Sequence, residues 1–304
     1  MNAGGSGDFD DIAKRFEALW QALQYNGTVK RETDETTMLI DRVRDALDKG
    51  LSRLNENNRE FIANSFTMEE RVHVSARTEI YRIRHRDLQT NHALKTLHPD
   101  HADDEIARRL LLREAHIALP LKHDNLHAPQ MMLRLDDGRP ALIFEWAESS
   151  LSQRLSDGSF SATEIGQAMD ALLSGLTFLH SRHLIHCDLA PDNLLLSGGE
   201  LASLKIADFG FALGAGQQHS DLDIGFAGHT EFLAPEQRDR APLNMRTDLY
   251  ACGLIMRLML ERCSDTDASV SRMAALATRL ARENPADRPD SANSALKTLR
   301  GIVV

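Results

Sequence analysis

Cysteine is scarce in this chain of 304 residues, which contains only Cys187, Cys252 and Cys263. The number is odd, and no two of the three have the short spacing of a zinc-binding or redox pair. Neither a disulfide framework nor a structural zinc site is therefore indicated. This cysteine usage fits a protein of the reducing cytoplasm.

Long apolar runs and long basic runs are also missing. No apolar stretch approaches the roughly 18 residues of a membrane-spanning helix, and the N-terminal residues lack the basic and apolar segments of a secretory signal. The 35 basic residues are scattered and the formal net charge is −10, which does not favour nucleic-acid binding. We therefore expect a soluble, cytoplasmic protein without a membrane span.

The N-terminal part of the chain has the pattern of two helices. The first residues are glycine-rich and polar, so we expect them to fray. Apolar residues then recur at helical spacing from Ile12 to Leu23, before an Asn-Gly stop signal. A second helix is predicted at about 33–54. We interpret residues 1–60 as a helical extension whose apolar stripe packs on the next domain or, as the less favoured alternative, on a partner.

From about residue 66 the pattern changes from helical to strand-like. Predicted strands are Arg71–Ser75, Glu79–Arg84, His92–Leu97, Met131–Leu135 and Ala141–Glu145, with one helix at about 103–121. Predicted helices after Ser150 lie at about 162–181, 246–263, 268–282 and 290–301. The chain therefore belongs to the α+β class, with a small sheet-rich part at 66–147 and a larger helical part at 148–304.

Three short motifs lie in a fixed order in the helical part. They are His-Cys-Asp-Leu-Ala-Pro-Asp-Asn at 186–193, Ala-Asp-Phe-Gly at 207–210 and Ala-Pro-Glu at 234–236. In this order they resemble the motifs of eukaryotic-type (Hanks-type) protein kinases, in particular bacterial serine/threonine kinases. The resemblance implies a two-lobed protein kinase fold, with a five-stranded N-lobe that carries one helix and a large helical C-lobe, preceded here by the N-terminal extension.

Two further matches concern the scaffold. The resemblance implies that Glu236 pairs with Arg288 in a buried carboxylate–guanidinium clamp. It also implies that Asp248, at the start of a helix, binds the backbone of the loop at 186–193. The Ala-Pro-Glu motif and its arginine partner separate the chain from aminoglycoside phosphotransferases, which have a similar catalytic loop.

The resemblance assigns the chemistry of phosphoryl transfer to three side chains. Asp188 matches the residue that accepts or orients the proton of the substrate hydroxyl, while Asn193 and Asp208 match the metal ligands. Such hard oxygen ligands suit Mg²⁺, or Mn²⁺ in its place. Taken singly, Asp208 fits an ordinary turn residue and Asn193 a loop cap. Their joint occurrence favours a magnesium-dependent ATP site.

The sheet-rich part contains the matching nucleotide-binding residues. Lys95, in Ala93-Leu94-Lys95, resembles the strand lysine that holds the ATP phosphates, and Glu114 matches its helical ion-pair partner, so both are assigned to catalysis. The other residues that the resemblance assigns to ATP are Ile80, Ala93, Leu195, Ser75, Thr78 and the hinge residues Glu145, Trp146 and Ala147.

Glycine is absent where the family's phosphate-covering loop contains it. Counted back from Ile80, the three glycine positions fall on His73, Ser75 and Thr78. Glycine there lets backbone N–H groups approach the phosphates closely. We therefore expect a modest nucleotide affinity, partly compensated by hydroxyl contacts from Ser75 and Thr78.

Three substitutions depart from the family's pattern near the catalytic aspartate. Cys187 replaces the arginine that binds a phosphate on the activation loop, which predicts activity independent of phosphorylation there. Ala190 replaces a lysine, and His229 stands where serine/threonine kinases have a threonine. That lysine and threonine normally act together near the transferring phosphate, so we interpret their joint loss as one change. Thr230, one residue further on, is a candidate substitute for the missing threonine.

Three functions fit these observations. The first is an ATP- and Mg²⁺-dependent protein kinase acting on serine or threonine of an unidentified protein substrate. The second is a pseudokinase or scaffold with weak nucleotide binding, favoured by the glycine-free loop. The third, a small-molecule phosphotransferase, is supported only by Ala190 and a short C-lobe. The first is favoured by the complete set of Lys95, Glu114, Asp188, Asn193 and Asp208.

Overall fold

The chain divides into two compact units, residues 1–67 and 68–304. The computed structural model describes residues 6–33, scattered positions between 35 and 46, and residues 61–62, 65–214, 216–222 and 229–303.

Unit 1 contains a helix and short paired strands. Its elements are α1 (Ser6–Gln24), β1 (Tyr25–Asn26), β2 (Val29–Lys30) and β3 (Phe61–Ile62), and β3 pairs with the first residues of β4. The turn between β1 and β2 contains Gly27, whose φ of 65° lies in the left-handed region that glycine enters easily. The apolar spacing from Ile12 to Leu23 predicts α1 correctly. The second predicted helix, at about 33–54, lies largely outside the described residues.

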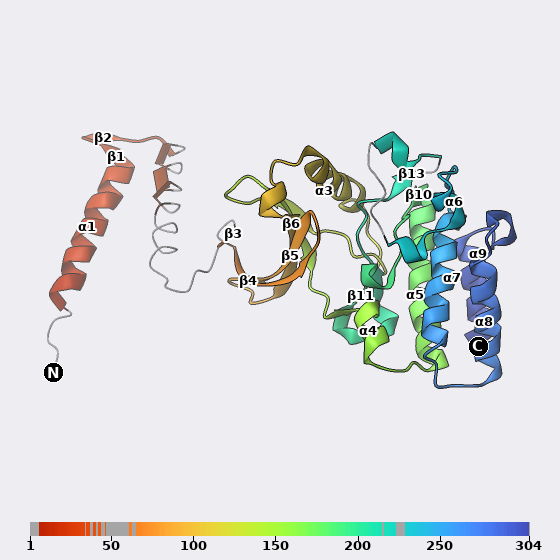
Figure 1. Cartoon of the computed structure of the whole chain (residues 1–304). Coiled ribbons are helices and arrows are strands. Elements are labelled where there is room, and N and C mark those ends of the chain that lie inside the picture. Colours follow the sequence, from red (N-terminus) through yellow and green to blue (C-terminus); the bar gives the residue numbers. More distant parts are fainter. Residues whose placement is uncertain are drawn as a thin grey trace. The chain divides into compact units, whose positions relative to one another are not determined.

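Unit 2 begins with an antiparallel sheet and one helix packed on it (Figure 1). The strands follow the spatial order β4-β5-β6-β8-β7. Their bounds are β4 Phe66–Val74, β5 Thr78–His85, β6 Asn91–Leu97, β7 Met131–Arg134 and β8 Pro140–Glu145, and the helix is α3, Glu105–Ala118. Leu97, Leu111 and Leu142 are among the buried side chains between sheet and helix. These strands and the helix confirm the predicted N-lobe.

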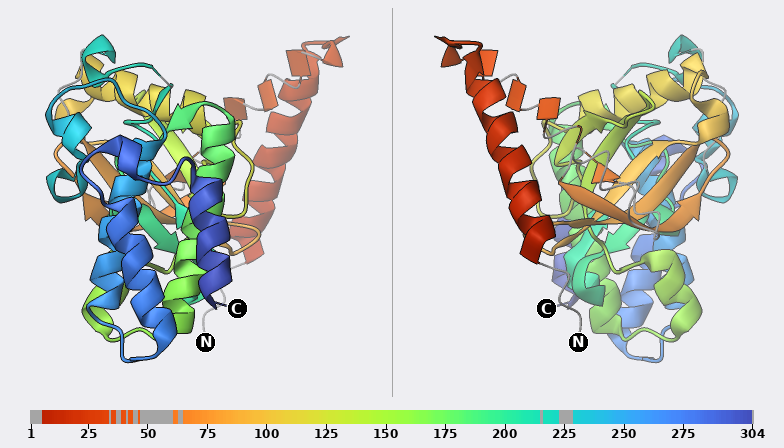
Figure 2. Two further views of the ribbon diagram at one scale, coloured as in Figure 1. Left: turned by 90° about the vertical axis from the view of Figure 1, so that its right-hand side faces the viewer. Right: turned by 90° about the vertical axis from the view of Figure 1, so that its left-hand side faces the viewer.

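The remainder of unit 2 is mainly helical (Figure 2). Its α-helices are α4 Leu151–Asp157, α5 Ala162–Ser181, α6 Pro235–Arg238, α7 Arg246–Leu260, α8 Ala268–Leu280 and α9 Ala292–Val303. Helix α5 packs against α7 and α9, and α8 packs against both of these. A Cβ at Gly253 would lie 2.6 Å from the backbone nitrogen of Ala281, so the close approach of α7 and α8 requires glycine there. No helix in the described part of the chain is long and apolar enough to cross a membrane.

Short strands fix the motif loops between the two lobes. They are β9 Ser149–Ser150, β10 Leu184–Ile185, β11 Leu194–Leu196, β12 Leu204–Ile206 and β13 Leu213–Gly214. Strand β11 pairs with both β9 and β12, and β10 pairs with β13. The loop at 186–193 therefore lies between β10 and β11, each of which is held by pairing with other strands. Asp208 follows the end of β12.

The expected carboxylate–guanidinium clamp is present in the C-lobe. Both terminal nitrogens of Arg288 donate to Glu236, over 2.6 and 2.8 Å. The other donors of the guanidinium reach the backbone carbonyls of Arg246, Arg282 and Glu283 at 2.7–3.0 Å. All five N–H groups of a buried arginine are thus used, and the clamp ties α6 and the start of α7 to the segment before α9.

Removing this clamp should destabilise unit 2 strongly. We expect Arg288→Ala to lower the free energy of unfolding by about 3–5 kcal/mol, because it leaves Glu236 buried without its partner. Arg288→Lys should recover only part of this, since an ammonium has three donors where the guanidinium has five. Denaturant unfolding followed by far-UV circular dichroism measures the free energy of unfolding of both variants. Arg279→Ala, at an exposed site on α8, serves as the control, and a loss below about 1 kcal/mol in Arg288→Ala would contradict the assignment.

Candidate active site

Lys95, Glu114 and Asp208 meet in one ion cluster, although they come from β6, from α3 and from the loop after β12. The Lys95 Nζ lies 2.8 Å from Glu114 Oε2 and 2.9 Å from Asp208 Oδ2. The side chains of Lys95 and Glu114 are 12% and 3% exposed, whereas that of Asp208 is 37% exposed. The pairing of β5 with β6 places Lys95 opposite Ile80. The cluster therefore has a buried end at Glu114 and an accessible end at Asp208.

The charges of this cluster shift one another's protonation. Burial and the Asp208 carboxylate raise the pKa of Glu114 to about 7, against the opposing effect of Lys95. Burial opposes the charged form of Lys95, but Asp208 and Glu114 outweigh it and raise the pKa of the ammonium above its usual value. Burial also opposes ionisation of Asp208, yet the ammonium of Lys95 lowers the pKa of this carboxyl below its usual value. Lys95 and Asp208 are therefore firmly charged, and Glu114 is the group of the three that titrates near neutrality.

Asp188 and Asn193 are joined within the loop at 186–193. The Asn193 amide nitrogen donates to the backbone carbonyl of Asp188 over 2.8 Å and to its Oδ2 over 3.1 Å. The backbone N–H of Ala207 donates to the carbonyl of Asn193 over 2.8 Å. Asn193 is thus linked on one side to Asp188 and on the other to the residue that precedes Asp208.

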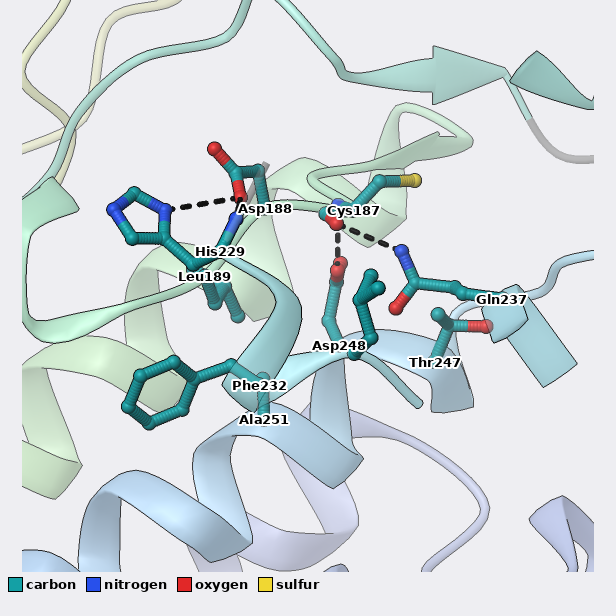
Figure 3. A pocket seen from close by; sticks show the side chains of 10 residues that line it. Cys187, Asp188, Leu189, His229, Phe232, Gln237, Thr247, Asp248 and Ala251 are labelled. Atoms are coloured by element: carbon teal, nitrogen blue, oxygen red, sulfur yellow. Dashed lines mark hydrogen bonds and ion pairs between the residues drawn. The ribbon is translucent and has the colours of Figure 1, made fainter. Parts of the chain in front are cut away.

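Asp248, at the start of α7, binds the backbone of this loop (Figure 3). Its Oδ1 accepts the backbone N–H of Cys187 and its Oδ2 that of His186, each over 2.9 Å. The Nε2 of His180 lies 2.9 Å from the same Oδ2. Burial raises the pKa of Asp248, but the bond to His180 and the charges nearby reverse the effect and leave it lowered. These contacts confirm the expected link between Asp248 and the loop backbone.

Two non-glycine residues at this site have left-handed backbone conformations. They are Cys187, with a φ of 67°, and Asp208, with a φ of 62°. Each such residue costs about 1–3 kcal/mol and persists only where the surroundings hold it. Asp248 binds the backbone of Cys187, and Lys95 binds the side chain of Asp208. Both strained positions thus lie at side chains that the sequence assigns to the active site or directly beside them.

The loop between β4 and β5 is closed by its own hydroxyl groups. The backbone N–H of Ser75 donates to the carbonyl of Thr78 over 2.8 Å, and the two hydroxyl oxygens lie 2.8 Å apart. The Ser75 oxygen also accepts the backbone N–H of Thr78 over 3.0 Å. The Nε of Arg77, in the same turn, lies 3.7 Å from Oδ2 of Asp104, the residue that caps α3. The hydroxyls expected to contact a nucleotide are therefore engaged with each other.

A histidine that sequence reasoning missed contacts the hinge from the segment between α3 and β7. His127 is buried, stacks on Phe144 with ring centroids 5.2 Å apart, and has its Nε2 2.9 Å from the carbonyl of Glu145. Burial lowers the pKa of His127, so the neutral ring donates its Nε2–H to this carbonyl. Trp146 lies beside Arg82, whose guanidinium carbon is 5.8 Å from its ring centroid. No motif in the sequence links His127 to the hinge.

The remaining apolar residues assigned to ATP are distributed over four segments. Ile80 lies on β5, Ala93 on β6 and Leu195 on β11, while Ala147 follows β8; all four are partly buried. Ala93 lies opposite Phe144 in the pairing of β6 with β8. Their partial exposure contrasts with fully buried neighbours such as Leu94.

Comparisons with known proteins agree with this geometry. The protein kinase domain family matches residues 20–298. The calcium/calmodulin-dependent protein kinase type II of Caenorhabditis elegans is 30% identical over 158 residues, covering 49% of this chain and 21% of that protein. The probable serine/threonine-protein kinase PknB of Bifidobacterium longum is 26% identical over 180 residues, covering 55% of this chain and 26% of that protein. The crystal structure of the PknI kinase domain of Mycobacterium tuberculosis has a TM-score of 0.58 at 23% identity, covering 78% of this chain and 96% of that one.

The chain therefore belongs to the eukaryotic-type (Hanks-type) protein kinase family, whose members similar to it include bacterial serine/threonine kinases. The resemblance and the α+β kinase fold inferred from the motifs are confirmed. At 23% identity the structural similarity shows the fold alone. The chain spans 21% and 26% of the lengths of the two curated relatives.

The raised pKa of Glu114 predicts a specific dependence of stability on pH. Because the value is about 7 in the folded chain against 4.5 ordinarily, the contribution of Glu114 is fully present below pH 4.5 and is lost as pH rises through 7. The unfolding free energy of the wild type should therefore fall relative to Glu114→Gln over this window, by as much as about 3 kcal/mol. Denaturant unfolding at a series of pH values measures the difference. Glu105→Gln, exposed on α3, is the control, and parallel curves for wild type and Glu114→Gln would refute the prediction.

Proposed function

We propose that the chain is an active protein kinase that transfers the γ-phosphoryl group of ATP to serine or threonine hydroxyls of protein substrates, without phosphorylation of its activation loop. The proposal is supported above all by the ion cluster of Lys95, Glu114 and Asp208 beside the bonded pair Asp188 and Asn193. A scaffold has no need of a buried lysine held between two carboxylates, or of a third carboxylate held by an asparagine in the catalytic loop.

Lys95 would neutralise the charge of the bound phosphates. Its ammonium is held by Glu114 from the buried side and by Asp208 from the accessible side. Position and charge are thus set before a nucleotide arrives, so little reorganisation is needed on binding. Asp188, fixed through its Oδ2 by Asn193, is suited to orient the substrate hydroxyl and accept its proton.

The residues present fit a magnesium ion. One oxygen of Asp208 binds Lys95 and the side chain is partly exposed, while the Asn193 amide uses its nitrogen within the loop and leaves its oxygen for a metal. The described residues contain no group of three or more His, Cys, Asp or Glu side chains that would form an all-protein cage, and Mg²⁺ commonly takes one or two protein ligands plus phosphates and water. When bound, Mg²⁺ would neutralise charge on the phosphates.

A second candidate, a pseudokinase that binds nucleotide weakly, is favoured by the loop between β4 and β5. Its glycine positions carry side chains, and the hydroxyls of Ser75 and Thr78 bond to each other. Nucleotide binding without turnover would distinguish this function from catalysis. A binding measurement with ATP, made beside the activity assay, therefore separates the two.

The direct test incubates the purified full chain with labelled ATP, Mg²⁺ and dephosphorylated casein. We expect label on the chain itself or on casein, and a loss of at least about 10²-fold in Asp208→Asn, which keeps the shape of the side chain but removes its charge. Asp239→Asn, an exposed site after α6, should retain full activity. Wild-type rates in a folded Asp208→Asn variant would remove this residue from the mechanism, and an inactive wild type that binds ATP would favour the pseudokinase.

Independence from loop phosphorylation gives a separate prediction. Cys187 is 4% exposed and its sulfur lies 3.6 Å from the carbonyl of Ile185, so it offers no cation to a phosphate. Between residues 211 and 233 the sequence contains only two hydroxyl side chains, Ser220 and Thr230. The double variant Ser220→Ala/Thr230→Ala should therefore keep most of the activity in the casein assay. A collapse of activity that recurs in Ser220→Ala alone would show that a phosphorylation site is required.

A further inference from the structure

His229 binds Asp188 through both its backbone and its side chain. The backbone N–H of His229 donates to Asp188 Oδ1 over 2.9 Å, and its ring Nδ1 lies 3.2 Å from the same oxygen. Figure 3 shows the ring facing this carboxylate from the opposite side of the pocket to Gln237. His229 directly precedes the short helix Thr230–Phe232, so this contact joins the activation segment to the catalytic loop.

The contact fixes the half of the Asp188 carboxylate that Asn193 does not hold. Asn193 donates to Oδ2, and His229 occupies Oδ1. An ionised carboxylate only accepts hydrogen bonds, so the proton of the imidazole must lie on Nδ1. Two segments far apart in the chain therefore fix the two oxygens, and the plane of the carboxylate is determined by both.

His229 is also placed to carry a positive charge. Its Nε2 lies 3.8 Å from Asp192 Oδ2, and the negative charge of Asp208 also favours the protonated ring. The hydrogen bond to Asp188 raises the pKa of His229 above its ordinary value, although burial opposes this. Within the loop itself Ala190 supplies no cation, and Lys95 is engaged by Glu114 and Asp208.

We propose that His229 is a positioning residue for Asp188. Its imidazole supplies both the orienting contact and the positive charge that a lysine in place of Ala190 and a threonine in place of His229 would otherwise supply together. The proposal rests on the proposed kinase activity. The ring holds Oδ1 in place, while Oδ2 accepts one hydrogen bond from Asn193 and keeps acceptor capacity for the hydroxyl proton. Since the side chain of His229 is 36% exposed, its position is not explained by core packing.

A matched pair of amide variants tests the role of Nδ1. The amide nitrogen of Asn lies near the position of Nδ1, whereas that of Gln extends toward the position of Nε2. His229→Ala should lower kcat by about 10²-fold, because the carboxylate loses its orientation, and should leave the KM for ATP nearly unchanged. His229→Asn should retain clearly more of kcat than His229→Gln. His116→Gln, at an exposed site on α3, should behave as the wild type.

A double variant tests whether His229 replaces a lysine–threonine pair. Ala190→Lys combined with His229→Thr should recover kcat relative to His229→Thr alone, because the amine restores a cation beside Asp188. Wild-type kcat in His229→Ala would overturn the proposal. Equal losses in the Ala, Asn and Gln variants without recovery in the double variant would also overturn it, since they indicate a merely structural role.

A readout independent of activity separates this inference from the proposed function. Nitrogen NMR of the histidine rings should show His229 protonated at Nδ1, with its signal shifted in Asp188→Asn. If the wild type transfers no phosphate but the NMR signals behave in this way, the kinase activity fails while the pairing is retained. If Nδ1 carries no proton and Asp188→Asn leaves the signal unchanged, the pairing itself is rejected.

Discussion

The buried carboxylate of Asp248 is the contact on which the geometry of the site depends. It accepts hydrogen bonds from the backbone N–H groups of His186 and Cys187 and contacts the ring of His180. Helix α5, which carries His180, helix α7 and the catalytic loop are therefore joined at one carboxylate. The ring of His186 then lies 3.0 Å from the carbonyl of Ala207, directly before Asp208. Asp208 binds Lys95, so these hydrogen bonds, together with the peptide link from Ala207 to Asp208, connect the C-lobe to the sheet.

This network explains why strained backbone is tolerated at Cys187 and Asp208. A left-handed conformation at a side-chain-bearing residue is unfavourable by itself. At Cys187 the amide is held by Asp248, and at Asp208 the carboxylate is held by Lys95 and the amide of Gly210. The contacts that maintain the strain are the same contacts that orient the groups assigned to phosphoryl transfer.

Much of this arrangement could be predicted from short-range patterns. The helix α1, the five strands of the sheet and the long C-terminal helices follow from apolar periodicity, because that period reflects which face each element buries. The residues of the ion cluster and Asp188 with Asn193 were identified through motif resemblance, which carries long-range information that periodicity lacks. Element ends were less well predicted; α3, expected at about 103–121, spans Glu105–Ala118, since Asp104 caps it.

The sequence by itself determined the family, the order of the elements and the residues of the motifs. Only the tertiary structure decided how individual polar groups are used. It paired the hydroxyls of Ser75 and Thr78 with each other, directed His127 to the hinge carbonyl and brought His229 to Asp188. The physical reason is that a hydrogen bond tolerates a variation of only a few tenths of an ångström in the distance between donor and acceptor. Chain spacing does not set such distances across 41 residues, as between His229 and Asp188; the packing of loops on the two lobes does.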